Sequence, residues 1–221
     1  MDIHLIPGLG TDHRIFQRLL VHHPSRIAHD WPRMANGSTL RHFAQALAER
    51  IDTSRPHVLL GMSMGGMVAQ ELAAITQPRH VVIVSSWKGP HEMPPAIRLM
   101  RRTHPERVLT KVMLARIATM VRWQMGVTTH EEVVLLDSFM HGIALEQLKV
   151  QIAAVLGWPG PVSPVKDILH IHGDQDRLMP LDLVRDAVVV PGGSHFMVWT
   201  QAAEVEAIIR SRIPELSHHS V

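Results

Sequence analysis

A serine enclosed by glycines is the residue of this sequence whose surroundings most clearly favour chemistry. Ser63 lies in Gly61-Met62-Ser63-Met64-Gly65, after the apolar run Val58–Leu60 and before a stretch whose apolar residues have helical spacing. A chain that turns this abruptly from strand to helix has no room for side chains two places from the apex, and glycine removes the colliding Cβ. The apex residue is then held in a sparsely populated backbone conformation, and such strain clusters at functional sites. Ser63 is therefore a candidate nucleophile.

A serine hydroxyl needs partners before it can attack anything at neutral pH. It requires an adjacent base, and that base requires a third group that fixes its tautomer and stabilises its cation. His195 and Asp176 are the candidates, because each lies in a turn directly after a strand-like run. The carboxyl ends of parallel strands are where sites form in open α/β sheets. Asp174, two residues before Asp176, remains a rival for the acid.

Other segments that could bind a cofactor or a metal are incomplete. Gly8-Leu9-Gly10 follows a strand, as a dinucleotide loop does, but His13 stands where a third glycine belongs. The segment 61–66 lacks the lysine of a phosphate loop. His170 and His172 share one face of their strand and could hold a metal together, yet packing is the simpler interpretation. We expect no metal and no cofactor.

Composition places the chain among ordinary globular proteins. The 221 residues suffice for one domain with a sizeable core, at 46% hydrophobic and 19% charged residues. The net charge is +2, and the basic stretch Arg98–Arg107 has no interleaved aromatic residues, which does not favour nucleic-acid binding. With no cysteine, a disulfide or a thiolate nucleophile is excluded. No secretory signal or membrane span is visible. We expect a small-molecule substrate, no nucleic-acid or membrane partner and a cytoplasmic location, while the oligomeric state stays open.

The elements that must position these residues alternate between strand and helix. Six strand-like runs are predicted: Asp2–Ile6, Arg26–His29, Val58–Leu60, His80–Ser85, Lys166–His172 and Asp186–Val190. Their alternation with helical patterns predicts an α/β fold with a mostly parallel sheet of about six strands covered by helices. Between residues 89 and 157 helical periodicity dominates. We interpret 89–157 as a helical cap or excursion within one domain that spans residues 1–221.

These motifs resemble those of the α/β-hydrolase fold superfamily over nearly the whole chain. The segment around Ser63 is similar to its nucleophile elbow, Gly173-Asp174-Gln175-Asp176 to its acid turn, and Gly193-Ser194-His195 to its histidine turn. The chain order of serine, acid and histidine also agrees. The segment from Pro7 to Phe16 resembles a group of small bacterial hydrolases, with Pro7 where the superfamily often has histidine. The resemblance starts at the superfamily's third strand, which leaves about six strands.

The resemblance implies a role for each residue. Ser63 would attack a carbonyl carbon, His195 would take its proton and return one to the leaving group, and Asp176 would orient His195. The backbone N–H groups of Leu9 and Met64 would form an oxyanion hole, in which losing one donor typically costs about 100- to 1,000-fold in rate.

The predicted substrate pocket contains Gly8, which lets the backbone approach closely, together with Trp87, Met120 and Trp123. For Trp87, packing alone remains an alternative interpretation. For Met120 and Trp123, packing in the core of the cap is the favoured interpretation. The prediction is a serine hydrolase that cleaves a small carboxylic ester or thioester through an acyl-enzyme. The same triad could instead serve a lyase or a cofactor-free oxygenase, or belong to a ligand-binding receptor with slow or vestigial hydrolysis.

Overall fold

The computed structural model describes residues 1–216, which contain one six-stranded sheet. Its strands are β1 (Asp2–Ile6), β2 (Arg26–Ala28), β3 (His57–Met62), β4 (His80–Val84), β5 (Leu169–Gly173) and β6 (Val188–Val190). The strand order is β2-β1-β3-β4-β5-β6, and every neighbouring pair is parallel. The predicted α/β fold with a six-stranded sheet is confirmed, and β6 is shorter than the sequence pattern indicated.

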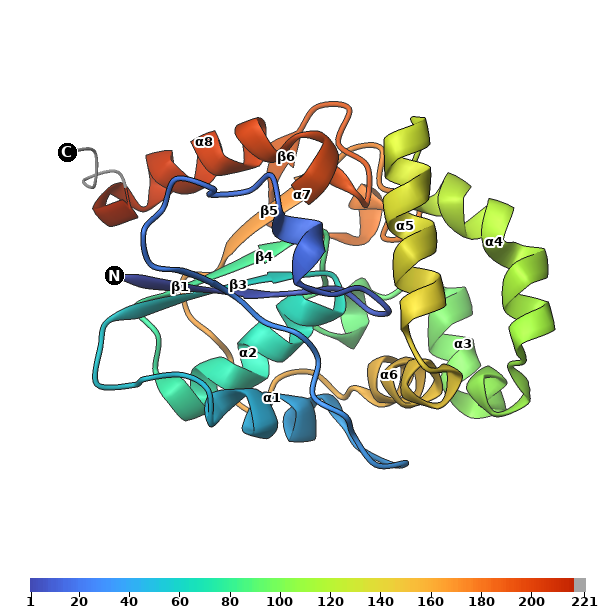
Figure 1. Cartoon of the computed structure of the whole chain (residues 1–221). Helices are drawn as coiled ribbons and strands as arrows, with labels where there is room; N and C mark the ends of the chain where they lie inside the picture. The colour runs from blue at the N-terminus through green and yellow to red at the C-terminus, as the bar shows by residue number, and fades with distance from the viewer. Residues whose placement is uncertain (217–221) are drawn as a thin grey trace.

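Helices cover both faces of this sheet (Figure 1). The helices α1 (Leu40–Ala48) and α2 (Met64–Thr76) lie on one face, and α8 (Ala202–Arg212) lies on the other. Successive side chains of β3 alternate between these layers: Val58 and Leu60 pack in the core that includes α8, and Leu59 packs in the core with α1 and α2. A strand buried on both faces needs apolar residues at every position, which explains the continuous apolar runs in the sequence.

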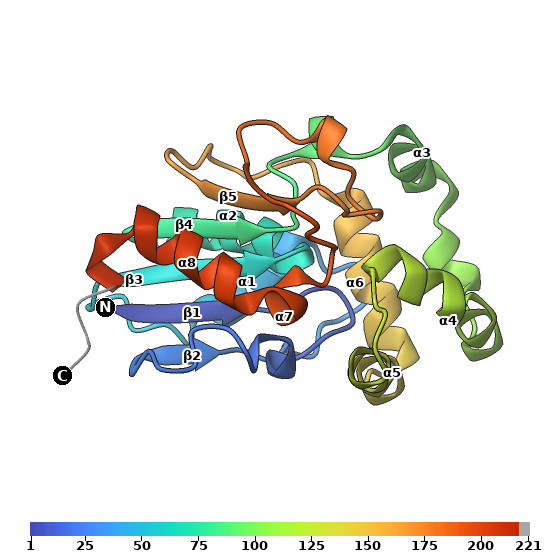
Figure 2. The same ribbon diagram turned by 90° about the horizontal axis from the view of Figure 1, so that it is seen from above.

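Four further α-helices lie between β4 and β5 in the chain. They are α3 (Pro95–Thr103), α4 (Lys111–Met125), α5 (His130–Gly142) and α6 (Leu145–Gly157). Figures 1 and 2 show α3, α4 and α5 beyond one end of the sheet, the end at which the strands finish. Only Met125 of α4 is buried, and no residue of α3 is. In both views these helices lie beyond the carboxyl ends of the strands. The interpretation of residues 89–157 as a helical cap or excursion stays a prediction.

Two short elements complete the frame around the strand ends. A 3-10 turn, η1 (His13–Phe16), follows the loop after β1, and α7 (Met197–Thr200) follows the loop after β6. Both are anchored by buried residues, Phe16 in η1 and Met197 in α7. Within residues 1–216, no helix is both long enough and apolar enough to cross a membrane.

Candidate active site

The chain turns sharply at Ser63, between β3 and α2. Ser63 has φ 55° and ψ −123°, a conformation that L-residues rarely adopt. Three backbone contacts hold it: its N–H donates to the carbonyl of Val84 at 2.9 Å, and its carbonyl accepts from the N–H groups of Gly66 at 2.9 Å and Met67 at 3.4 Å. The hydroxyl of Ser86 donates to the same carbonyl at 2.7 Å. The strained turn is thus fixed by β4 and by the first turn of α2.

The glycines beside Ser63 are required by close approach of the backbone. A Cβ at Gly61 would lie 2.1 Å from the carbonyl oxygen of Gly65, and a Cβ at Gly65 would lie 2.1 Å from that of Ile6. Neither backbone atom can move without displacing a strand or a helix. Any larger residue at these two positions would therefore disrupt the turn.

Three residues from distant parts of the chain meet at the strand ends. The Nε2 atom of His195 lies 3.0 Å from Oγ of Ser63, and its Nδ1 atom lies 2.8 Å from Oδ2 of Asp176. All three residues are buried. A carboxylate only accepts hydrogen bonds, so the Nδ1–H group of His195 donates to Asp176, and Nε2 is left to accept the serine proton. The three predicted residues therefore form one continuous hydrogen-bonded series.

Asp176 is held as a carboxylate in the turn after β5. Its Oδ1 atom accepts from the N–H groups of Leu178 at 3.0 Å and Met179 at 2.8 Å. Burial alone would raise the pKa of Asp176, but the electrostatic interaction and hydrogen bond with His195 and the bond from the Met179 amide bring that pKa below its ordinary value. The group therefore stays ionised beside His195. The rival acid, Asp174, is exposed and instead accepts from the N–H of Gly192 at 2.7 Å.

His172 supports this acid turn, a role that sequence reasoning missed. Its Nε2 atom lies 2.7 Å from the carbonyl oxygen of Met179, to which it donates, and its Nδ1 atom lies 3.3 Å from Nε2 of His170. Burial is the main cause that lowers the pKa of His172, so the ring stays neutral. The sequence indicated only that the two histidines share a strand face, and nothing in it places one against the loop of Asp176.

A cavity of about 350 Å³ opens beside Ser63 and His195. Its walls come from the loop after β1, the start of α2 and the helices α3 to α6. Among the described residues that line it, none is an aspartate, glutamate, lysine or arginine. Gln124 is the one polar side chain that α4 contributes. The cavity therefore suits an apolar, uncharged group.

Two of the predicted pocket residues line this cavity and two do not. Gly8 and Trp87 belong to its wall. Met120 and Trp123 are 50% and 59% exposed and lie outside the lining, so both interpretations from the sequence, substrate contact and cap core, were wrong for them. The reason is that α4 has apolar residues on both of its faces, and its inner face carries others, among them Ile117. The ring of Trp123 instead lies under the guanidinium group of Arg177, 4.8 Å from it.

Both residues predicted to form the oxyanion hole belong to the wall of this cavity. Leu9 and Met64 line the cavity with Ser63. Within residues 1–216, neither the Leu9 nor the Met64 N–H group donates to a protein acceptor. Met64 is the first residue of α2, where backbone N–H groups have no partner within the helix. The next amide of the loop, that of Gly10, donates to Oε1 of Gln151 in α6 at 2.8 Å.

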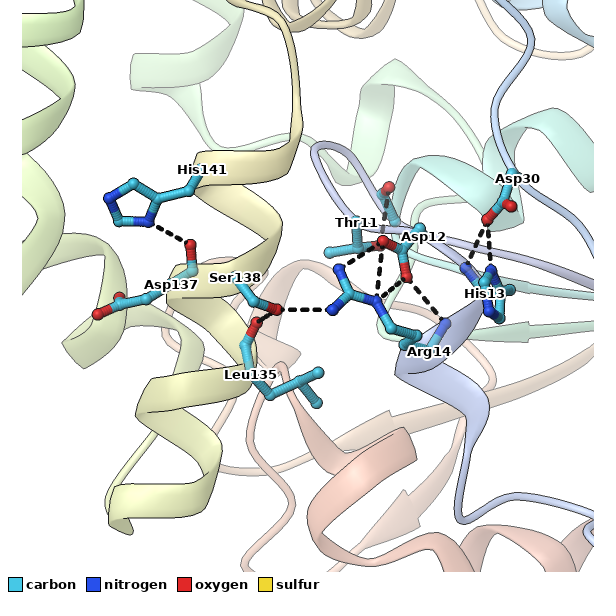
Figure 3. A network of polar contacts seen from close by, with 10 residues as sticks. Thr11, Asp12, His13, Arg14, Asp30, Leu135, Asp137, Ser138 and His141 are labelled. Carbon is cyan, nitrogen blue, oxygen red and sulfur yellow. Dashed lines mark hydrogen bonds and ion pairs between the residues drawn. The ribbon is translucent and has the colours of Figure 1, made fainter.

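The loop after β1 is also tied to α5 through Arg14 (Figure 3). The guanidinium group of Arg14 donates to Oδ2 of Asp12 at 2.7 Å and to Oγ of Ser138 at 3.0 Å.

Asp12, His13 and Asp30 each offer one possible metal-ligand atom, and these atoms lie within 4.8 Å of one another, a spacing that could suit a metal ion. Both carboxylates already have partners, however: Asp12 pairs with Arg14, and Asp30 pairs with the backbone and ring of His13.

Comparison with known proteins agrees with this architecture. Residues 5–208 match the sequence profile of the alpha/beta hydrolase family. Among solved structures, a thermophilic esterase from Thermogutta terrifontis superimposes with a TM-score of 0.80 at 19% identity, covering 98% of this chain and 90% of the esterase. A hydrolase from Pseudomonas aeruginosa gives 0.74 at 17% identity (95% and 88% covered), and MenH from S. aureus gives 0.73 at 14% identity (99% and 95% covered).

At such identities the structural likeness shows the fold alone, whereas the profile match spans most of the chain. No curated protein matches the chain in sequence. The profile match agrees with two features of the structure: the six-stranded parallel sheet and the glycine-flanked serine at the end of β3. The chain belongs to the alpha/beta hydrolase family.

Proposed function

We propose that this chain is a serine hydrolase that cleaves neutral carboxylic esters or thioesters with an apolar acyl group. One observation carries the proposal: the hydrogen-bonded series Ser63, His195 and Asp176 ends beside an uncharged cavity. A hydroxyl next to an imidazole that is itself oriented by a carboxylate is the arrangement that activates a serine for attack on a carbonyl carbon.

In the first half of the reaction, the Nε2 atom of His195 takes the proton of Ser63 as Oγ bonds to the carbonyl carbon. The carbonyl π electrons move to its oxygen, which becomes an oxyanion. The Asp176 carboxylate stabilises the imidazolium, and the Leu9 and Met64 N–H groups donate to the oxyanion. The oxyanion then collapses, the bond to the leaving oxygen or sulfur breaks, and the imidazolium gives its proton to the leaving group.

In the second half, water replaces the alcohol or thiol. His195 takes a proton from the water as the water oxygen bonds to the acyl carbon, and a second oxyanion forms beside the Leu9 and Met64 N–H groups. Its collapse breaks the bond to Oγ of Ser63, which regains a proton from His195. The products are a carboxylic acid and free enzyme, so atoms and charges balance without a further reactant.

The cavity supports the choice of substrate class. Each methylene group removed from water contributes about 0.8 kcal/mol, which is roughly fourfold in binding. A free carboxylate at the end of the acyl group would instead enter a cavity without a cationic side chain among the described residues, at a cost of several kcal/mol. Neutral acyl chains are therefore favoured over acidic ones.

The test is a series of p-nitrophenyl esters from acetate to decanoate, with p-nitrophenyl hemisuccinate as the acidic member. We expect kcat/KM to rise with chain length until the cavity is filled, and to be lowest for the hemisuccinate. Ser63→Ala should abolish turnover and labelling by a fluorophosphonate, while circular dichroism reports an unchanged fold.

Equal turnover by wild type and Ser63→Ala would overturn the nucleophile assignment. Labelling of Ser63 without turnover of any ester would overturn the hydrolase assignment. That second result would favour the lyase, the oxygenase or the receptor.

A further inference from the structure

The carbonyl group of Gly8 receives more hydrogen bonds than a turn requires. It accepts from the N–H of Thr11 at 3.2 Å, from Oγ1 of Thr11 at 3.0 Å and from the indole Nε1 of Trp31 at 2.9 Å. A carbonyl oxygen has two lone pairs, so three donors saturate it. The orientation of the peptide between Gly8 and Leu9 is therefore strongly fixed.

This peptide also carries the N–H group of Leu9. In a planar trans peptide the C=O and N–H bonds point in opposite directions. The carbonyl of Gly8 points toward its donors on Trp31 and Thr11, so the N–H of Leu9 points away from both of them. Gly8 itself lies close to the nucleophile, because a Cβ at Gly8 would lie 3.5 Å from Cβ of Ser63.

The two donor residues, Thr11 and Trp31, attach the peptide between Gly8 and Leu9 to different parts of the structure. Thr11 belongs to the same four-residue turn as Gly8, with Gly10 at φ 71° in its third position, as a type II turn requires. Its hydrogen bonds would travel with the turn if the turn moved. Trp31 lies between β2 and α1, and its ring packs edge to face on Phe43 of α1, with centroids 5.4 Å apart. Among residues 1–216, only Trp31 connects the Gly8 carbonyl to the body of the domain in this way.

We infer that Trp31 is a positioning residue for the oxyanion hole: its indole N–H holds the Gly8 carbonyl so that the Leu9 N–H faces the reacting oxygen. The inference rests on the proposed hydrolase function. Rotation of this peptide would remove one donor and place a carbonyl oxygen near the developing negative charge. Trp31 touches no substrate and acts through the peptide alone.

The first variant is Trp31→Phe, which keeps an aromatic ring and removes the N–H donor. Because the two Thr11 contacts remain, we expect part of the loss seen when a whole oxyanion donor is removed, roughly 10-fold to 100-fold in kcat. KM should change less than about twofold, since the acyl cavity is untouched. The Ki of an alkyl trifluoromethyl ketone, whose Ser63 adduct carries an oxyanion, should rise by the same factor as kcat/KM falls.

The matched control is Phe43→Leu, which weakens the packing of the Trp31 ring and keeps its N–H. Because the N–H donor is retained, it should lower the melting temperature and should change kcat and the Ki of the ketone much less than Trp31→Phe does. If Trp31→Phe does not fold, 3-benzothienylalanine in place of Trp31 keeps the shape of the indole and removes only its N–H donor. The same kinetic losses are expected for that isostere.

Wild-type kcat and Ki in a folded Trp31→Phe protein or in the isostere would overturn the inference. So would an equal loss of kcat in Phe43→Leu, because packing alone would then explain it. The failure of the proposed function is distinguishable from these results, because it shows as ester turnover that survives Ser63→Ala or is absent from the wild type.

Discussion

The hydroxyl of Ser86 donates a 2.7 Å hydrogen bond to the carbonyl oxygen of Ser63, the residue with φ 55° at the turn between β3 and α2. Ser86 is fully buried just beyond β4, so this contact joins the strained turn to the neighbouring strand. Strained conformations persist only where surrounding contacts hold them. Ser86 is one such contact, outside the hydrogen-bonded series of Ser63, His195 and Asp176.

Ser86→Ala should therefore reduce both stability and turnover. The Ser63 carbonyl keeps its bond to the N–H of Gly66, so we expect a loss of about 1 kcal/mol in the free energy of unfolding. We also expect kcat to fall several-fold as the serine becomes less well ordered. Urea denaturation and ester kinetics measure the two effects.

Ser85→Ala is the matched control for this prediction. Ser85 is the adjacent residue and equally buried, but its hydroxyl has no hydrogen-bond partner among the described residues. Removing it should leave kcat unchanged and stability equal or higher. The same losses in both variants would show that the Ser86 hydrogen bond has no special role.

Asp176→Asn should nearly abolish turnover while the protein stays folded. An amide in place of the carboxylate no longer stabilises the imidazolium of His195 and favours the wrong tautomer, which typically lowers kcat by about 10⁴-fold. Asp174→Asn tests the rival acid at the same turn and should lower kcat less than about twofold, because Asp174 is exposed and pairs with Gly192. A larger effect at Asp174 than at Asp176 would reverse the assignment.

Ile117→Trp should shorten the acyl chain that the enzyme prefers. Ile117 lines the cavity from α4, so a larger side chain fills space that the end of a long acyl group would occupy. We expect the ester with maximal kcat/KM to become shorter by two or more carbons, with acetate turnover preserved. Met120→Trp is the control on the outer face of α4, where Met120 is 50% exposed, and its chain-length profile should match the wild type. Identical profiles for all three proteins would place the acyl group elsewhere.

Stability should fall in mild acid because of two buried histidines, one in β1 and one directly after β2. His4 and His29 are hydrogen bonded through ring nitrogens at 2.9 Å, and burial is the first cause that lowers the pKa of each from 6.5 to about 4. Between pH 6.5 and about 4 the unfolded chain binds more protons than the folded one. The free energy of unfolding therefore decreases as the pH falls through this window, and these groups have no effect on it above the window.

The slope should be on the order of 1 kcal/mol per pH unit for each histidine. Urea denaturation at pH 7, 6, 5 and 4.5 measures it. His4→Gln removes one of the two groups and should flatten the dependence, whereas His22→Gln, at an exposed position, should leave it as in the wild type. A pH-independent wild type would contradict the prediction.

Much of the site could be predicted because its chemistry depends on residue types in local patterns. The glycines at 61 and 65 indicated a turn without room for side chains, and the structure places backbone oxygens 2.1 Å from both added Cβ atoms. Asp176 and His195 lie in the turns that follow apolar strand-like runs, and the carboxyl ends of parallel strands meet at a common edge. The predicted residues therefore meet in one place.

The predictions for the cavity failed in part for a physical reason. Ile117 and Met120 are apolar residues three positions apart on α4, about 60° from each other around the helix axis, and helical periodicity alone does not say where between them the inward face ends. The packing of α3 to α6 over the strand ends decides this, and it turns Ile117 inward and Met120 outward.

The sequence by itself determined the sheet, the turn at Ser63 and the order of the reactive residues, because these follow from local sterics and from the period of burial. Only the tertiary structure decided which groups support them. Trp31 at the Gly8 carbonyl, Ser86 at the Ser63 carbonyl and His172 at the Met179 carbonyl are all contacts to backbone atoms. Every residue presents the same carbonyl group, so nothing in the residue types along a chain specifies which carbonyl a distant side chain will reach.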